Sequence, residues 1–222
     1  MEIDIKQMMK NLFIFTIITF SIACATVTTI GKSAGAKDFP PGTLVYINIS
    51  DNITLKPIPE VPNNLSQETI KSTLYNKIKS TIEMLNGKVV EQLPQNCDNC
   101  YEIKVTSVNI ASSKSTKNHT DIEKGYENYP YPYYTSELNA DVEMFKTDNN
   151  DKLGSKTFYV KSYSRLQEGK LPPLNELNGK DIDDYVTRPK YDFKELTEEL
   201  GDRVAYWSSK RLNKYVENLS TN

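Results

Sequence analysis

The segment SELNADVEMF, residues 136–145, alternates between apolar and polar side chains from Leu138 to Met144. The apolar positions are Leu138, Ala140, Val142 and Met144, and the residues between them are Asn139, Asp141 and Glu143. Because successive side chains of a β-strand point to opposite faces of the sheet, this pattern predicts a strand with one buried and one exposed face. A polar turn follows, and SKTFYVKSYSR, residues 155–165, is predicted to return as the hairpin partner.

Three further segments are predicted to be strands. TLVYINIS, residues 43–50, carries β-branched and aromatic residues on alternating sides. KVVEQL, residues 88–93, is a short strand, and YEIKVTSVNIAS, residues 101–112, is a longer one. In the longer strand the apolar alternation slips between Val105 and Val108, which predicts a bulge or twist. LKPIPEVPNN, with three prolines, is predicted to be an irregular connection.

A first amphipathic helix is predicted from about Gln67 to Asn86, where apolar residues recur every three to four positions. Its apolar positions are Ile70, Leu74, Ile78, Ile82 and Leu85. Asn64 or Ser66 can cap its first turn, and Gly87 stands where such a helix is expected to end.

A second amphipathic helix, from Phe193 to about Leu219, is predicted to begin with a capping arrangement of Asp192 and Glu195. A loop rich in Pro, Gly and Asp, residues 167–191, precedes it. The order of elements is therefore β-α-β-β-β-β-α. This order predicts an α+β fold with a largely antiparallel twisted sheet and two helices packed on one face. Residues 43–222 are expected to form a single domain.

Residues 1–23 have the pattern of a secretory signal peptide. Lys6 and Lys10 supply the positive charge, and Leu12–Ala23 form an apolar segment. This segment is shorter than the roughly 20 apolar residues that a membrane-spanning helix needs. Residues 24–42, which are small and polar and end in Pro-Pro-Gly, are typical of a flexible tether.

Cys24 follows the apolar segment, and two cleavage sites compete there. SIAC, residues 21–24, resembles the lipobox of bacterial lipoproteins, in which a peptidase cuts before a cysteine that carries diacylglycerol, although Ser21 replaces the usual aliphatic residue. The resemblance implies lipidation of Cys24, with a fatty acid such as palmitate. ACA, residues 23–25, instead fits the small-x-small rule of ordinary signal peptidase, which would remove Cys24. The cysteine count favours lipidation, because the other two cysteines are expected to pair with each other.

CDNC, residues 97–100, has the spacing of a redox motif. Thioredoxin-like cysteines stand at the N-terminus of a helix, which lowers the pKa of the thiol. Here the motif lies between two predicted strands, so we expect a structural disulfide between Cys97 and Cys100.

The sequence contains no recognisable catalytic arrangement. His119, the single histidine, lies in the polar run SKSTKNHTD, far from any nucleophile elbow, and is predicted to be an exposed loop residue. Asp181, Asp183 and Asp184 lack the glycine and distal glutamate of an EF-hand loop and are predicted to be a solvated acidic loop. A net charge of -2 with interspersed signs argues against a nucleic-acid partner. We expect a non-enzymatic protein without metal or cofactor.

The segment GYENYPYPYYTSE, residues 125–137, is the candidate binding surface, on a predicted proline-stiffened connection between two strands. Its tyrosines are Tyr126, Tyr129, Tyr131, Tyr133 and Tyr134. Tyrosine combines a large apolar area with a hydroxyl group, which binding surfaces favour. The alternative is that these rings cover the end of the domain's own core, and both interpretations remain open at this point.

The order of elements after a lipobox-like cysteine resembles that of small envelope lipoproteins, notably lipopolysaccharide-assembly lipoproteins of the LptE type. The resemblance covers about residues 43–219 and consists of element order and hydrophobic pattern. It implies a lipid-anchored outer-membrane protein, facing the periplasm or the cell surface. Its partner would be an envelope protein or glycolipid, and its role that of an accessory in lipopolysaccharide assembly or envelope transport. The alternative is a secreted or surface-exposed binding protein or adhesin without lipid.

Overall fold

The computed structural model describes residues 37–61, 65–94, 97–177, 181–189 and 192–221. All of these residues belong to one unit. The predicted signal peptide, the lipidation of Cys24 and residues 24–36 of the predicted tether lie outside the described residues.

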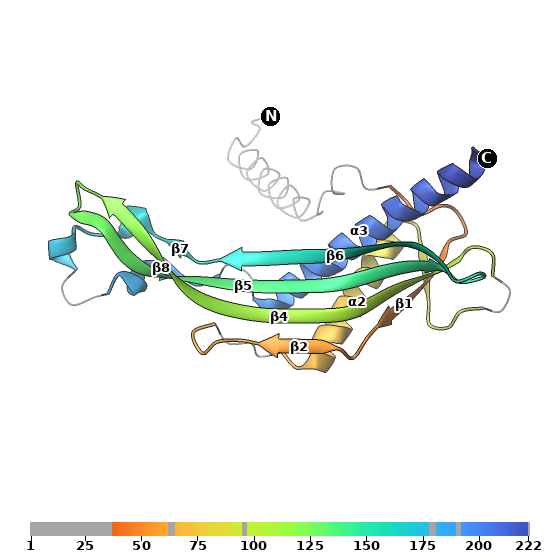
Figure 1. Cartoon of the computed structure of the whole chain (residues 1–222), viewed down its shortest axis with the longest axis horizontal. Helices are drawn as coiled ribbons and strands as arrows, with labels where there is room; N and C mark the ends of the chain where they lie inside the picture. Colours follow the sequence, from red (N-terminus) through yellow and green to blue (C-terminus); the bar gives the residue numbers. More distant parts are fainter. Residues whose placement is uncertain (1–36, 62–64, 95–96, 178–180, 190–191, 222) are drawn as a thin grey trace, which may run out of the picture. The chain divides into compact units, whose positions relative to one another are not determined.

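The sheet is organised around three long antiparallel strands, β4 (Cys100–Asp121), β5 (Tyr126–Lys146) and β6 (Asp151–Tyr163) (Figure 1). The predicted hairpin is confirmed, and the apolar residues of its first strand are all buried, namely Leu138, Ala140, Val142 and Met144. The predicted irregularity of β4 is present as well, because its pairing with β5 shifts register between Val105 and Ser107.

The hairpin of β4 and β5 is longer than predicted. The strand expected over residues 101–112 continues to the end of β4, and β5 already begins at Tyr126. The tyrosine-rich segment expected to be a connection is therefore part of a strand. Pro130 and Pro132 are tolerated there because β6 ends opposite Thr135, which leaves this end of β5 at the edge of the described sheet. Proline, which has no N–H, is found mainly on such edges.

Parallel strands complete the sheet on the other side of β4. β1 (Leu44–Ile49) pairs in parallel with both β4 and β3 (Lys88–Val90), so the strand order is β3-β1-β4-β5-β6. β2 (Ile53–Lys56) also pairs in parallel with β4, which corrects the prediction of an irregular connection beginning at Leu55. The prolines of that segment begin only at Pro57, after the strand has ended. The sheet is mixed and mostly antiparallel, and the predicted α+β class is confirmed.

Both helices lie on one face of this sheet, as predicted (Figure 1). Ser66 caps the N-terminus of α2 (Gln67–Met84), because its side chain accepts a hydrogen bond from the Thr69 N–H. Asp192 caps the N-terminus of α3 (Phe193–Ser220), because its carboxylate accepts a hydrogen bond from the N–H of Glu195. Within the described residues, no helix is long and apolar enough to cross a bilayer.

The two helices approach each other closely at Gly201 of α3. A Cβ atom at this position would lie 2.8 Å from both Cβ and Cγ of Lys77 on α2. Beside this contact, the hydroxyl of Thr81 donates to the carboxylate of Asp202 at 2.6 Å, and the Lys77 ammonium lies 3.2 Å from the same carboxylate. The absence of a side chain at Gly201 is therefore what allows these polar contacts to form between the helices.

The chain between β6 and α3, which includes the loop expected over residues 167–191, contains short regular elements. They are β7 (Arg165–Leu166), three 3₁₀ turns at Glu168–Lys170, Leu174–Glu176 and Ile182–Tyr185, and β8 (Val186–Thr187), which pairs with β7. Figure 1 shows this segment against the far end of the β4–β5 hairpin, away from the C-terminal end of α3. Tyr126, Leu171 and Ile182 form a second buried cluster there, separate from the core between sheet and helices.

Candidate binding site

The five tyrosines of the candidate segment have different environments. Tyr126 and Tyr134 are 0% exposed. For these two residues the contact hypothesis is corrected, because their rings lie inside the protein and are not available to a partner. Tyr129 and Tyr131 are partly buried against the second cluster. Only Tyr133 packs on the open face of the sheet, as described below.

Tyr126 is at the centre of the second cluster. Its hydroxyl donates to the carbonyl oxygen of Pro172 at 2.9 Å, and burial raises the pKa of this hydroxyl. The Tyr129 ring contacts it edge-on, with centroids 5.4 Å apart. The rings of this cluster therefore hold the chain after β6 against the hairpin.

Tyr134 is covered by a basic and an acidic residue of the chain between β6 and α3, namely Arg188 and Asp183. The guanidinium carbon of Arg188 lies 4.0 Å from the centroid of the Tyr134 ring, and the tyrosine hydroxyl donates to the carboxylate of Asp183. Arg188 and Asp183 also form an ion pair at 3.0 Å. The prediction of a solvated acidic loop is therefore wrong for Asp183. Asp181 and Asp184 cap the last 3₁₀ turn through reciprocal hydrogen bonds.

An aromatic group lies on the face of the sheet opposite the helices. Tyr133 stacks on Tyr163 with centroids 6.0 Å apart and an interplanar angle of 20°, and the Lys117 ammonium lies 3.6 Å from the Tyr133 centroid. Tyr163 is 46% exposed, and Tyr159, four residues earlier on the same face of β6, is 58% exposed. The prediction missed Tyr159 and Tyr163, although their alternation with buried Phe158 pointed to that face.

Near these rings, polar side chains on the outer faces of β4, β5 and β6 pair with one another. The carboxylate of Asp141 accepts hydrogen bonds from the hydroxyls of Thr157 at 2.6 Å and Ser107 at 2.8 Å, and these bonds lower the pKa of Asp141. Lys161 pairs with Glu137 at 2.8 Å. We call Tyr133, Tyr159 and Tyr163 the outer tyrosines. They combine ring area with hydroxyl groups, which suits binding rather than acid–base chemistry.

His119 lies in β4 and is only 9% exposed, so the prediction of an exposed loop histidine is wrong. It is buried because its ring packs beside Tyr126, with centroids 5.6 Å apart. Its Nδ1 lies 3.7 Å from a carboxylate oxygen of Glu168, which is too long for a hydrogen bond. In the part of the chain that the structure describes, no group of three His, Cys, Asp or Glu side chains is arranged to hold a metal ion.

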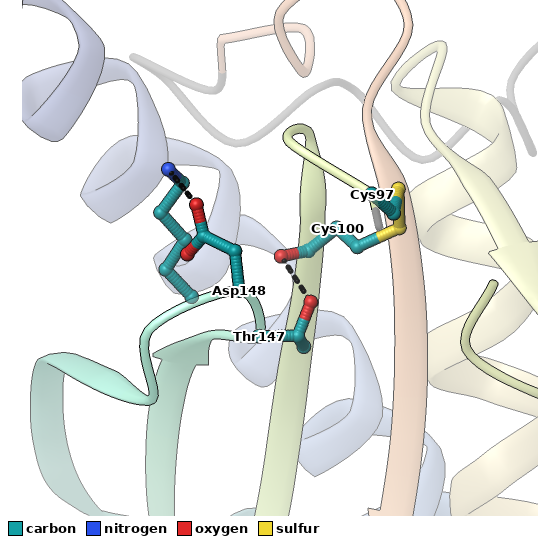
Figure 2. Close-up of a disulfide and its surroundings, with 5 residues drawn as sticks. Cys97, Cys100, Thr147 and Asp148 are labelled. Carbon is teal, nitrogen blue, oxygen red and sulfur yellow. Dashed lines mark hydrogen bonds and ion pairs between the residues drawn. A yellow bond between two sulfur atoms is a disulfide. The ribbon is translucent and has the colours of Figure 1, made fainter. Parts of the chain in front are cut away.

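The structure contains a disulfide between Cys97 and Cys100, with Cα atoms 5.5 Å apart (Figure 2). Cys100 is the first residue of β4 and pairs with Leu44 of β1. Its carbonyl oxygen accepts hydrogen bonds from both the N–H and the hydroxyl of Thr147, each at 3.0 Å. The disulfide therefore closes the turn at the position where three strands begin or end.

Replacement of Cys97 by serine is expected to reduce the free energy of unfolding by about 2 kcal/mol, because a loop this short restricts the unfolded chain only modestly. Cys97 is the better position for the change, since Cys100 is fully buried. The measurement is denaturant unfolding, together with thiol labelling of the exported, denatured protein mapped to each cysteine. Without reductant, neither Cys97 nor Cys100 should be labelled, and labelling of both would contradict the disulfide.

Comparisons with known proteins concern the fold alone. No protein-family model matches the sequence, and no curated protein is significantly similar to it. Among similar solved structures is a neuraminyllactose-binding hemagglutinin homolog from Helicobacter pylori, with 12% identity and a TM-score of 0.44 over 84% of this chain and 94% of that one. A minor lipoprotein from Acinetobacter baumannii has 7% identity and a TM-score of 0.36, over 73% and 87% of the two chains. Rare lipoprotein B from Shewanella oneidensis has 11% identity and a TM-score of 0.31, over 78% and 99%. Similarities at this level establish neither a family nor a function for this chain.

Proposed function

We propose that this chain is an exported, lipid-anchored protein of the bacterial cell envelope that binds another envelope component and catalyses no reaction. The observation that carries the proposal is the disulfide between Cys97 and Cys100. Disulfides persist in oxidising compartments and are rare in the cytosol. Export by residues 1–23 would bring the domain into such a compartment.

The same disulfide supports a separate role for Cys24. The chain has three cysteines, so pairing of the other two leaves Cys24, directly after the apolar segment. A single acyl chain anchors a protein only marginally, whereas two or three give stable membrane residence. Ala25 follows in place of the aspartate that retains many lipoproteins in the inner membrane, which favours the outer membrane.

We assign partner contact to the outer tyrosines in place of the buried Tyr126 and Tyr134. Exposed aromatic rings on an otherwise polar face are typical of a surface that another molecule covers. The partner in this proposal is an envelope protein or a glycolipid. An accessory role in lipopolysaccharide assembly or envelope transport is the narrower hypothesis, and it rests on the order of elements.

Replacement of Cys24 by serine tests the anchor. In a bacterial host fed a labelled fatty acid, the variant should lose all label and accumulate as uncleaved precursor in the inner membrane, because serine cannot form the thioether. The control replaces Cys97 and Cys100 together by serine and should retain the label.

The opposite outcome for the serine variant is cleavage after Ala25 and a soluble exported product, which would eliminate the lipoprotein interpretation. It would favour the second candidate, a secreted or surface-exposed binding protein or adhesin, which the small-x-small pattern of residues 23–25 supports.

A further inference from the structure

A groove of about 440 Å³ runs between the end of β1 and the first half of α2. One wall is β1, from Tyr46 to Ile49, with Asp51 beyond it. The other wall consists of Glu68, Lys71, Ser72 and Tyr75 of α2. These four positions follow the i, i+3, i+4, i+7 spacing, so they form one stripe along the helix. In Figure 1 the end of β1 and the start of α2 lie at the same edge of the sheet.

The edge of β1 that lines this groove lacks a neighbouring strand. β3 pairs with β1 only from Leu44 to Tyr46 and then ends. The N–H groups of Leu44 and Ser50 donate to Asn99 and Val105 on the β4 side. Because the backbone groups of successive residues in a strand alternate in direction, those of Ile47 and Ile49 point to the opposite side. The parallel pairing of Tyr46 with Val90 of β3 uses the Ile47 N–H, so the Ile47 carbonyl and the backbone of Ile49 are the groups left facing the groove.

The Ile49 N–H has no hydrogen-bond partner within the described ranges. An unpaired strand edge of this kind is a template for another strand. The groove lies in line with β3 along the edge of β1. A strand bound in the groove would pack against Tyr75 of α2, just as β3 packs against α2. The unpaired Ile47 carbonyl and Ile49 N–H can form hydrogen bonds with the backbone of a partner, and an extended chain presents matching groups in a row.

The charged side chains at one end of the groove favour a peptide with a cationic side chain. Asp51 and Lys71 form an exposed ion pair there. Glu68 is close enough to Asp51 for the two carboxylates to influence each other. Hydrogen bonds from its own backbone and from Ser66 lower the pKa of Glu68, so it stays ionised. Two carboxylates and one ammonium leave a net negative charge, which a cationic side chain would complement.

We propose that this groove binds an extended peptide segment of another protein, which adds to β1 as a strand in line with β3 and places a Lys or Arg near Asp51 and Glu68. Alternate side chains of the peptide face the stripe on α2, and apolar ones fit against the ring of Tyr75. The backbone supplies the affinity and these contacts supply the specificity. The proposal is independent of the lipid anchor, so it and the Cys24 test can fail separately.

The test begins with selection of peptides from a phage-displayed library of random 12-residue sequences against the folded protein. A selected peptide is synthesised with a fluorophore, and its dissociation constant is measured by fluorescence polarisation. Selected peptides should share alternating apolar positions and a Lys or Arg. On binding, amide hydrogen exchange at Ile49 should slow at least tenfold, because its N–H becomes hydrogen-bonded.

Ser72→Trp should raise the dissociation constant of the same peptide at least tenfold, because an indole at this exposed position fills the groove. Ser80→Trp is the matched control, since Ser80 is also exposed on α2 and both hydroxyls donate to the carbonyl three residues earlier at 3.0 Å. Ser80→Trp should change the dissociation constant less than twofold. Glu68→Gln should raise the dissociation constant of a peptide that carries Lys or Arg about threefold to tenfold.

Three results would overturn the proposal. One is a library that yields no peptide, and another is a selected peptide whose affinity and effect on Ile49 are the same in Ser72→Trp. The third is self-association of the protein that Ser72→Trp abolishes, in the absence of any selected peptide. That result would assign the groove to a second copy of this chain.

Discussion

Replacement of Gly201 by leucine is expected to lower the free energy of unfolding by about 3 kcal/mol, near the upper end for overpacking a core. Even the first added carbon would lie 2.8 Å from Cβ and Cγ of Lys77 and 3.3 Å from the backbone nitrogen of Ile78. These atoms belong to or adjoin the backbone of α2, so the helix itself has to move. The movement would also separate Asp202 from Thr81 and Lys77.

The sign of this effect is informative, because glycine inside a helix ordinarily destabilises it by about 1 kcal/mol relative to alanine. At an unpacked helical site its replacement would therefore be stabilising. Denaturant unfolding of Gly201→Leu and of the control Gly169→Leu measures the difference. Gly169 has no atom within 4 Å of an added Cβ, so its variant should stay within about 0.5 kcal/mol of the parent protein. Equal stabilities of the two variants would show that the helices do not meet at Gly201.

Replacement of Tyr126 by alanine is expected to remove about 3–5 kcal/mol from the stability of the second cluster, the usual range for truncating a buried aromatic ring. The ring is 0% exposed and contacts both His119 and Tyr129. Without it, the segment from Arg165 to Thr187 should detach from the hairpin, while the main core beneath α2 and α3 stays folded.

Amide hydrogen exchange resolved along the chain measures this local opening. Exchange should accelerate in residues 165–187 and stay slow in residues 138–144. Tyr126→Phe, which loses only the hydrogen bond to Pro172, should lower the stability of the second cluster by about 1 kcal/mol. Tyr159→Ala, on the exposed face of β6, is the control and should change little. If Tyr126→Ala behaved like Tyr159→Ala, the ring would not belong to a core.

The regular elements were predictable because their signals are local. The alternation of residues 138–144 identified a strand and its buried face, and the spacing of Ile70, Leu74 and Ile78 identified α2. Each helix also begins beside a residue that the sequence marks as a cap, Ser66 or Asp192. Such patterns depend only on the geometry of one strand or one helix, so neighbouring residues are enough to reveal them.

The far end of the hairpin could not be predicted in the same way. Residues 113–121 are mostly polar, and Pro130 and Pro132 argue against a strand in the middle of a sheet. They belong to long strands because β6 ends early and leaves an edge that accepts proline. His119 looked exposed among polar neighbours, and its burial comes from the Tyr126 ring on the paired strand.

The amino-acid sequence by itself determined the α+β class, the helices with their caps, and the inward face of β5, because periodicity is a property of consecutive residues. Only the tertiary structure decided which tyrosines are available to a partner. Tyr126 and Tyr134 are buried by Pro172, Asp183 and Arg188, which lie about 45 to 55 positions further along the chain. Tyr133 remains at the surface beside Tyr163. The same residue type is core or surface depending on what the fold brings against it, and no local pattern contains that information.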